Sequence, residues 1–226
     1  MEIDHIFMLI APPAQGVAPE LTYFQSLGLT PTYERHHPGQ GTQNLCFCFD
    51  NLFVELLWIC SADEARSERI ARTRLYERSG WRANGTNPFG ISWRRSADAL
   101  QPLTSVWRYD PPYLPPGASI DVAADSDDPR QPMMFKSPGG VPPIDWPAEK
   151  KGGLQHVGGW GRVLGIELLL PSAVPPSPAL ESIAAQTMLN LQVSGDDQFS
   201  MTLLIENRGG TPPRSCLQPL ILRLPV

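Results

Sequence analysis

Two ionisable side chains interrupt apolar runs of the sequence. His5 stands in the run Ile-Asp-His-Ile-Phe-Met-Leu-Ile over residues 3–10, and Glu55 stands in Leu-Phe-Val-Glu-Leu-Leu-Trp-Ile over residues 52–59. Both runs are short and rich in branched and aromatic residues, which is typical of buried strands. An ionised carboxylate in such a strand is costly unless a metal ion, a histidine or a bound substrate pairs with it. The two residues therefore predict a site inside a β-sheet cavity.

Other candidates for the same site are weaker. His37 ends a predicted strand, and Gln43 and Asn44 enter the next one, where either amide could contact a ligand. His156 stands in a glycine-rich loop that could fold over the mouth of a cavity and complete the site. Trp93 is a candidate for the lining of an apolar pocket. The competing interpretations are solvated loop residues for the histidines and a core residue for the tryptophan.

Composition excludes several classes of protein. The chain has 226 residues, 42% of them hydrophobic, which is enough for one large domain or two small ones. A net charge of −5 without a Lys/Arg cluster argues against a nucleic-acid partner. The sequence contains neither an apolar stretch long enough for a membrane span nor a signal-peptide pattern, so we expect a cytoplasmic protein without a membrane partner. The four cysteines show neither CxxC nor zinc-finger spacing and are expected to be buried or semi-buried thiols rather than redox or metal-binding residues.

Hydrophobic periodicity predicts a βαβββ unit at the start of the chain, over residues 1–61. Gly28 ends its helix, and Asp50-Asn51 forms the hairpin turn between its last two strands. The expected elements are a strand at 3–10, a helix at 18–27 and strands at 31–37, 43–49 and 52–60.

The same pattern returns twice, which is typical of an internal repeat. A linking segment at 62–84, helical over 62–78, leads to a degenerate second module at 85–137, and a Pro/Gly-rich connector at 138–164 leads to a third, βαβββ-like module at 165–226. Each copy leaves one sheet face apolar, so the copies must pair to bury it. The expected elements are strands at 89–94, 106–110, 118–123, 132–136, 165–171, 189–194, 199–206 and 219–224, with helices at 96–106 and 178–187.

Four stretches of sequence resemble one known family. They are residues 4–10, 37–44, 52–56 and 89–94, the last together with Asp98. In these stretches the chain resembles the vicinal oxygen chelate superfamily, which includes glyoxalase I, extradiol dioxygenases and bleomycin-resistance proteins, and in particular its glyoxalase-like proteins. The resemblance implies an α+β fold in which repeated βαβββ modules form an open, cup-shaped mixed β-sheet barrel. It also allows a homodimer, because modules of this superfamily often pair across subunits.

The resemblance also implies a metal site. His5 matches the first-strand ligand position and Glu55 the last-strand position, and His156 is the candidate for a third ligand. The ion implied is Zn²⁺, Mn²⁺, Ni²⁺ or Fe²⁺, with Glu55 as ligand or general base. Gln43 stands where many relatives have a histidine, and the second module has no histidine on its first strand.

Three functions remain open at this point. The first is a metal-dependent enzyme that acts on a small substrate with vicinal oxygens, by isomerase, lyase or dioxygenase chemistry. The second is a non-catalytic protein of the resistance type that binds a small molecule or drug in the same cup. The third is a structural or regulatory module whose cup is filled by its own side chains. A divalent metal bound at Glu55 would favour the first, and tight metal-free binding would favour the second.

Overall fold

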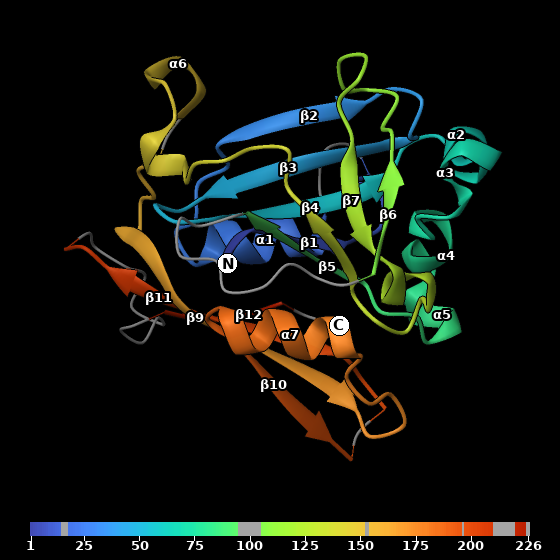
Figure 1. Cartoon of the computed structure of the whole chain (residues 1–226). Coiled ribbons are helices and arrows are strands. Elements are labelled where there is room, and N and C mark those ends of the chain that lie inside the picture. The colour runs from blue at the N-terminus through green and yellow to red at the C-terminus, as the bar shows by residue number, and fades with distance from the viewer. Residues whose placement is uncertain (15–17, 95–104, 152–153, 196, 210–219, 225–226) are drawn as a thin grey trace.

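The computed structural model describes the chain except for residues 15–17, 95–104, 152–153, 196, 210–219 and 225–226. Its strands form one large sheet and one smaller sheet, with short helices around them (Figure 1). The large sheet is mixed and strongly curved, and it ends in two free edges, so the expected α+β class with an open, cup-shaped sheet is confirmed. Among the described helices, none is long and apolar enough to cross a membrane.

The first half of the large sheet is a βαβββ unit. Its elements are β1 (Glu2–Leu9), α1 (Pro19–Ser26), β2 (Tyr33–His37), β3 (Thr42–Cys48) and β4 (Phe53–Ile59). After the helix, the chain runs through the antiparallel strands β2, β3 and β4, and β4 returns to pair parallel with β1. Nearly every residue of β1 is buried, because the strand has protein on both faces, and this explains its unbroken apolar run.

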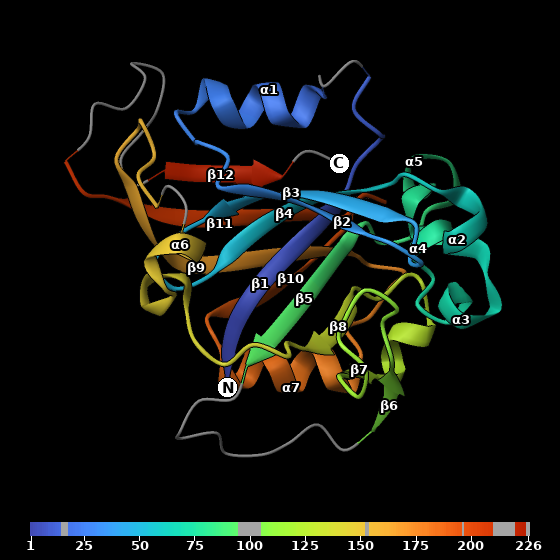
Figure 2. The same ribbon diagram turned by 90° about the horizontal axis from the view of Figure 1, so that it is seen from above.

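The second half of the large sheet repeats this arrangement. It contains β5 (Phe89–Arg94), β6 (Val106–Tyr109), β7 (Ile120–Ala123) and β8 (Met133–Lys136). Strand β8 pairs parallel with β5, as β4 does with β1, and the two halves join through the antiparallel pair β1 and β5, which lie side by side in Figure 2. The complete order is β2-β3-β4-β1-β5-β8-β7-β6. The helix expected at 96–106 falls almost entirely outside the described residues.

Short helices rather than one long helix connect the two halves. They are α2 (Ala62–Arg66), α3 (Glu68–Ala71), α4 (Leu75–Ser79) and α5 (Trp81–Asn84), gathered at one end of the sheet (Figure 2). The prediction of a continuous helix over 62–78 is wrong. Ser67 adopts extended backbone between α2 and α3, and Arg74 adopts a left-handed conformation, with φ of 59°, before α4. Both conformations interrupt the ladder of helical hydrogen bonds.

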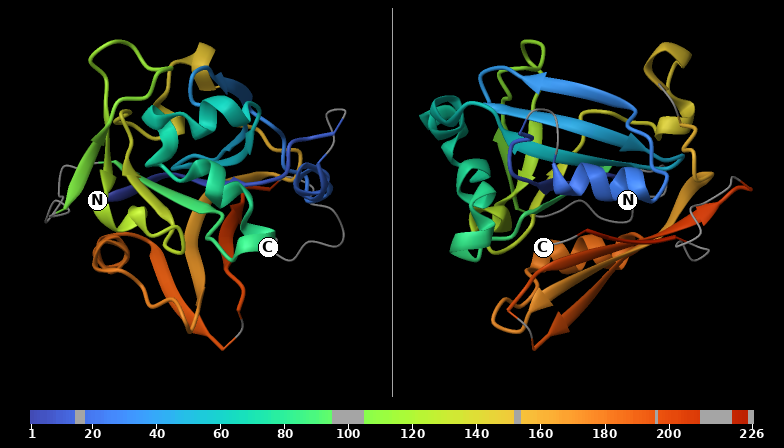
Figure 3. Two further views of the ribbon diagram at one scale, coloured as in Figure 1. Left: turned by 90° about the vertical axis from the view of Figure 1, so that its right-hand side faces the viewer. Right: turned by 180° about the vertical axis from the view of Figure 1, so that it is seen from behind.

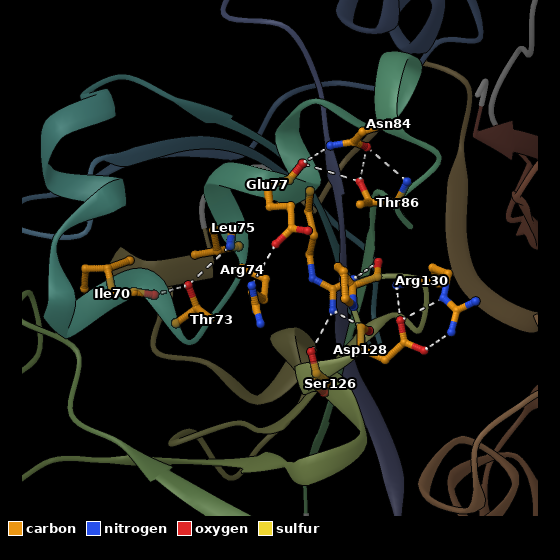
Figure 4. A network of polar contacts seen from close by, with 12 residues as sticks. Ile70, Thr73, Arg74, Leu75, Glu77, Asn84, Thr86, Ser126, Asp128 and Arg130 are labelled. Carbon is orange, nitrogen blue, oxygen red and sulfur yellow. Dashed lines mark hydrogen bonds and ion pairs between the residues drawn. The ribbon is translucent and has the colours of Figure 1, made fainter.

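A buried arginine fastens these helices to the second half. The guanidinium of Arg78 on α4 is fully buried and donates hydrogen bonds to five backbone carbonyls. Four of the five carbonyls belong to the 3-10 helix η1 (Ala124–Asp127) and the turn that follows it, and Figure 4 shows this turn at Ser126 and Asp128. Burial lowers the pKa of Arg78 to about 10, so the side chain stays charged. The carbonyls bound are those of Asn87, Ser126, Asp128, Pro129 and Gln131.

The last third of the chain forms the smaller sheet. A connector with η2 (Pro143–Asp145) and α6 (Ala148–Lys151) leads into β9 (Trp160–Pro171), α7 (Pro178–Gln186), β10 (Leu189–Ser194), β11 (Ser200–Asn207) and β12 (Leu220–Leu224). The element order matches the first unit, but the strand order is β10-β9-β11-β12. Here the strand after the helix pairs parallel with the first strand, whereas in the first unit it lies at the far edge of the sheet.

The smaller sheet packs below the large one as a separate layer (Figure 3). One hydrophobic core cluster spans both sheets and includes, for example, Met8 and Ile91 of the large sheet and Leu168 and Leu203 of the smaller one. Asn51 ties the layers together, because its side-chain amide both donates to and accepts from the backbone of Val163. This layer covers the convex face of the large sheet and leaves the concave face to form a cavity.

Candidate functional site

A cavity of about 320 Å³ occupies the concave face of the large sheet. Its walls are mostly apolar and aromatic, and they come from both halves of the sheet and from the connector. The aromatic lining residues are Phe7, Tyr33, Phe53, Tyr109, Tyr113, Phe135 and Trp146, and the ionisable or amide ones are Asp4, His5, Arg35, His37, Gln40 and Glu55. A largely apolar cavity with a few converging polar groups is the usual form of a small-molecule site.

His5 and Glu55 meet at the floor of this cavity. The parallel register of β1 and β4 places Phe7 opposite Glu55 and His5 opposite Phe53, so both polar side chains emerge on the same face of neighbouring strands. His5 Nε2 lies 3.9 Å from Glu55 Oε1, an electrostatic contact that is too long for a hydrogen bond. The imidazole stacks on Phe53 with ring centroids 4.4 Å apart, and the edge of Phe135 lies beyond it. The aromatic walls therefore fix the orientation of the ring.

Asp4 holds the other nitrogen of His5. Asp4 Oδ2 lies 3.0 Å from His5 Nδ1, so this nitrogen carries the proton and Nε2 faces Glu55. The sequence analysis missed Asp4, because strict alternation places it on the opposite face from His5. The pairing of β1 with β5 shifts register between Ile3 and His5, which turns Asp4 toward the cavity. Arg94 on β5 neutralises it through a contact of 3.3 Å.

Burial and charge perturb the protonation of all three groups. Burial raises the pKa of Glu55, although the charge of His5 and a hydrogen bond from Asn44 oppose the shift. Burial lowers the pKa of His5, but the hydrogen bond to Asp4 and the charge of Glu55 outweigh it, so the pKa is raised overall. The pKa of Asp4 is lowered despite burial, because its carboxylate accepts from His5. The site therefore combines a carboxyl of lowered pKa, a histidine of raised pKa and a second carboxyl of raised pKa, a combination that is typical of groups that transfer protons.

Two of the weaker candidates lie close to this centre. His37 lines the cavity from the end of β2, and its Nδ1 lies 2.9 Å from the hydroxyl of Thr42. Asn44 on β3 is buried behind Glu55, to which its side chain is hydrogen-bonded. Asn44 therefore supports the carboxyl from outside the cavity lining.

Three of the predicted site residues lie elsewhere. His156 is buried outside the cup, and both of its ring nitrogens bind backbone groups, namely the amide of Thr30 and the carbonyl of Cys48. The prediction that it completes the site is therefore wrong. Gln43 points to the other face of the sheet, where it contacts Glu34, and Trp93 is buried without lining the cavity. His156 was misplaced because a glycine-rich loop carries no signal of the face on which it packs.

The described residues do not complete a metal site. His5 and Glu55 offer two donor atoms to the cavity, and over the described parts of the chain no group of three or more His, Cys, Asp or Glu side chains is arranged to hold a metal ion. Most protein sites for the ions expected here use at least three protein ligands. The second half of the sheet adds none, because its cavity-lining residues on β8 are Met133 and Phe135.

Comparisons with known proteins place this site in a family context. Residues 3–88 match the family model described as the glyoxalase-like domain. Over these residues, which include His5 and Glu55, the chain is similar to glyoxalase-like domains. This confirms the resemblance seen in the sequence.

Solved structures give more distant likenesses. A hypothetical protein from Staphylococcus aureus is 10% identical, with 98% of each chain covered and a TM-score of 0.45. A triple mutant of 4-hydroxymandelate synthase from Streptomyces coelicolor is 14% identical, with a TM-score of 0.36, and the match covers 99% of this chain and 64% of the synthase. No curated protein matches the sequence.

Proposed function

We propose that the cup is the active site of a glyoxalase-like enzyme that acts on a small substrate with neighbouring oxygens. The arrangement of Asp4, His5 and Glu55 at the floor of a mostly apolar cavity supports this proposal. A cavity of about 320 Å³ suits a small molecule with an apolar body, and the polar floor suits its oxygens.

The chemistry proposed is proton transfer next to a carbonyl group. The carboxylate of Glu55 removes a proton from the carbon beside the carbonyl, and the electrons of the broken C–H bond move toward the carbonyl oxygen. The N–H of His5, held in place by Asp4, donates to the oxygen on which negative charge develops. The former carbonyl oxygen then takes the Nε2 proton of His5, the hydroxyl on the first carbon gives its proton back to His5, and Glu55 returns its proton to the neighbouring carbon, which completes an isomerisation. Because the described residues do not bring together three side chains that could hold a metal ion, the proposed step uses the side chains alone.

Hydrogen–deuterium exchange tests this step without knowledge of the natural substrate. Protein stripped with a chelator is incubated in D₂O with 2-hydroxyacetophenone, a compound with neighbouring oxygens, and loss of the C–H signal is followed by NMR. We expect catalysed exchange that falls on the order of 10²–10⁴-fold in Glu55→Gln. The control is Glu181→Gln, which changes an exposed residue of α7. Exchange that occurs only after Zn²⁺, Mn²⁺, Ni²⁺ or Fe²⁺ is added would contradict the metal-free step.

A non-catalytic binding protein is the second candidate. The observation that favours it is the cavity itself, whose walls are mostly apolar and aromatic. Calorimetry with small aromatic molecules separates the two functions. Binding without exchange, with the same affinity in Glu55→Gln, would support the binding protein.

A further inference from the structure

The edge strand β2 turns one free cation toward the cup. Tyr33, Arg35 and His37 alternate along β2, and all three line the cavity. Arg35 is exposed at the mouth, with its guanidinium 5.2 Å from the centre of the Tyr113 ring. Among the described residues, no carboxylate lies within ion-pair distance of Arg35, whereas Asp4 has both His5 and Arg94 as partners. Arg35 is thus the cation of the cup that lacks an anion.

The charge of Arg35 acts on the interior of the cup. It lowers the pKa of Glu55, although burial is the larger influence and raises that pKa overall. It also lowers the pKa of His37, in addition to the larger effect of burial, and that pKa falls to about 3. His37 is therefore neutral near pH 7, so that it can offer one N–H donor without adding a second charge beside Arg35.

A chain of hydrogen bonds determines which nitrogen of His37 carries the proton. Tyr109 donates its hydroxyl proton to Gln40 Oε1 at 2.7 Å, and Gln40 Nε2 donates to Thr42 Oγ1 at 2.7 Å. Thr42 then gives its own hydroxyl proton to His37 Nδ1 at 2.9 Å. With Nδ1 as an acceptor, the proton of the neutral ring sits on Nε2, which is the nitrogen left for a ligand.

Tyr113 holds the two groups together. Its ring lies 4.5 Å from the ring of His37 and 5.2 Å from the guanidinium of Arg35. One side of the mouth therefore presents a planar cation and an N–H donor against one aromatic surface. This combination matches a carboxylate, whose two oxygens accept parallel hydrogen bonds from a guanidinium.

We propose that Arg35 and His37 form an anion subsite that binds a carboxylate of the substrate. The proposal rests on the proposed function and narrows its substrates to small carboxylic acids that carry an apolar body and a reacting oxygen. Arg35 on β2 pairs with Asn44 on β3, and Asn44 pairs with Leu57 on β4, two residues beyond Glu55. At the usual strand spacing, the Cα atoms of Arg35 and Glu55 are therefore about 12 Å apart. Both side chains reach inward, so the carboxylate and the reacting oxygen need be only a few bonds apart.

Calorimetry with a matched pair of probes tests the subsite. The probes are 2-hydroxy-3-phenylpropanoate and its methyl ester, which differ in charge but share the aromatic body and the hydroxyl group. We expect the acid to bind at least ~10-fold more tightly than the ester. Arg35→Gln should remove this preference and leave the affinity for the ester unchanged, and Arg35→Lys should restore part of it. Arg66→Gln is the control, because Arg66 is exposed and also lies over a tyrosine ring, that of Tyr76, outside the cup.

The outcomes separate this proposal from the proposed function. Equal affinity for acid and ester in the unchanged protein would overturn the subsite, while binding of both would still agree with a small-molecule cup. A preference for the acid that survives in Arg35→Gln would also overturn it. If neither probe binds, the carboxylate subsite falls, and deuterium exchange with the uncharged ketone then decides whether the proposed function falls too.

Discussion

The two halves of the large sheet share one strand arrangement but differ in what they turn into the cup. In the first half, β1 and β4 contribute His5 and Glu55 to the cavity floor. In the second half, the corresponding pair β5 and β8 places Gly90 beside Met133 and Ser92 beside Phe135. The first half therefore carries the ionisable groups of the floor, and the second half provides an apolar wall.

This difference shows how two halves with the same strand arrangement can contribute different groups, ionisable side chains from one and an apolar wall from the other. Both halves need branched and aromatic residues to build the sheet, but the proposed proton transfer needs only the pair of His5 and Glu55. Loss of polar side chains from the second half removes the cost of burying more charge. It also removes the extra donors that a metal ion would need.

The largest expected effect comes from comparing one polar strand residue of the first half with one of the second half. Glu55→Gln should lower deuterium exchange on the order of 10²–10⁴-fold, whereas Ser92→Ala should change it less than about threefold. Ser92 Oγ is buried and has no hydrogen-bond partner among the described residues, so its removal should leave the protein as stable or slightly more stable. Exchange rates and melting temperatures of both variants check this expectation. If the exchange rate fell as much in Ser92→Ala as in Glu55→Gln, the proposal that only the first half supplies the reacting groups would be contradicted.

The second half should depend on Arg78 for its stability. Arg78→Met removes a buried charge and leaves five backbone carbonyls without their donor, so we expect the free energy of unfolding to fall by about 3 kcal/mol or more. The matched control is Arg74→Met, since Arg74 forms an exposed ion pair with Glu77 that contributes less than about 1 kcal/mol. Urea titration measures both variants. Equal stability of the two would show that the buried network is not needed.

The contact between β1 and β5, which joins the two halves, leaves no room for a side chain at position 90. A Cβ atom there would lie 2.0 Å from the ring of Phe7, so Gly90→Ala must push that ring into the cup. We expect a loss of about 1–3 kcal/mol in stability, together with weaker ligand binding. The double variant Gly90→Ala with Phe7→Leu should recover part of the loss, because the smaller side chain makes room. Full additivity of the two single changes would contradict this explanation.

The elements were predictable because each strand carries a clear local signal. The apolar runs around His5 and Glu55 place β1 and β4 within one residue of their observed bounds. The strand pairing that sets the site carries no such signal. The register shift that turns Asp4 inward depends on contacts with β5, and the face on which His156 packs depends on the connector. Both are tertiary effects, which explains why the sequence could suggest the His–Glu pair and miss its third member.

The smallest expected effect is on the pH dependence of stability, and it distinguishes His5 in the cup from His156, which is buried outside the cup. His5 gains charge in the cup, whereas burial lowers the pKa of His156 to about 4, because its ring binds backbone groups as a neutral imidazole. An unfolded chain protonates this histidine near its ordinary pKa of 6.5, so between pH 6.5 and 4 the unfolded state binds more protons than the folded state. Stability should therefore fall as the pH falls through this window, by about 1 kcal/mol at pH 5.5 for this residue.

The measurement compares how steeply the free energy of unfolding changes with pH in the unchanged protein and in His156→Gln. Urea titrations at pH 7.5, 6.5 and 5.5 give the free energy of unfolding of each, and the variant should lose less stability over this range because it lacks the titrating group. Its absolute stability will also fall, since the bonds to Thr30 and Cys48 change, but that loss does not depend on pH. His5 acts in the opposite sense, because its raised pKa makes the folded state hold its proton more firmly, and it contributes equally to both proteins. The control is His36→Gln, which changes an exposed histidine. If the free energy of unfolding of His156→Gln changes with pH in parallel with that of the unchanged protein, the fold does not keep His156 neutral.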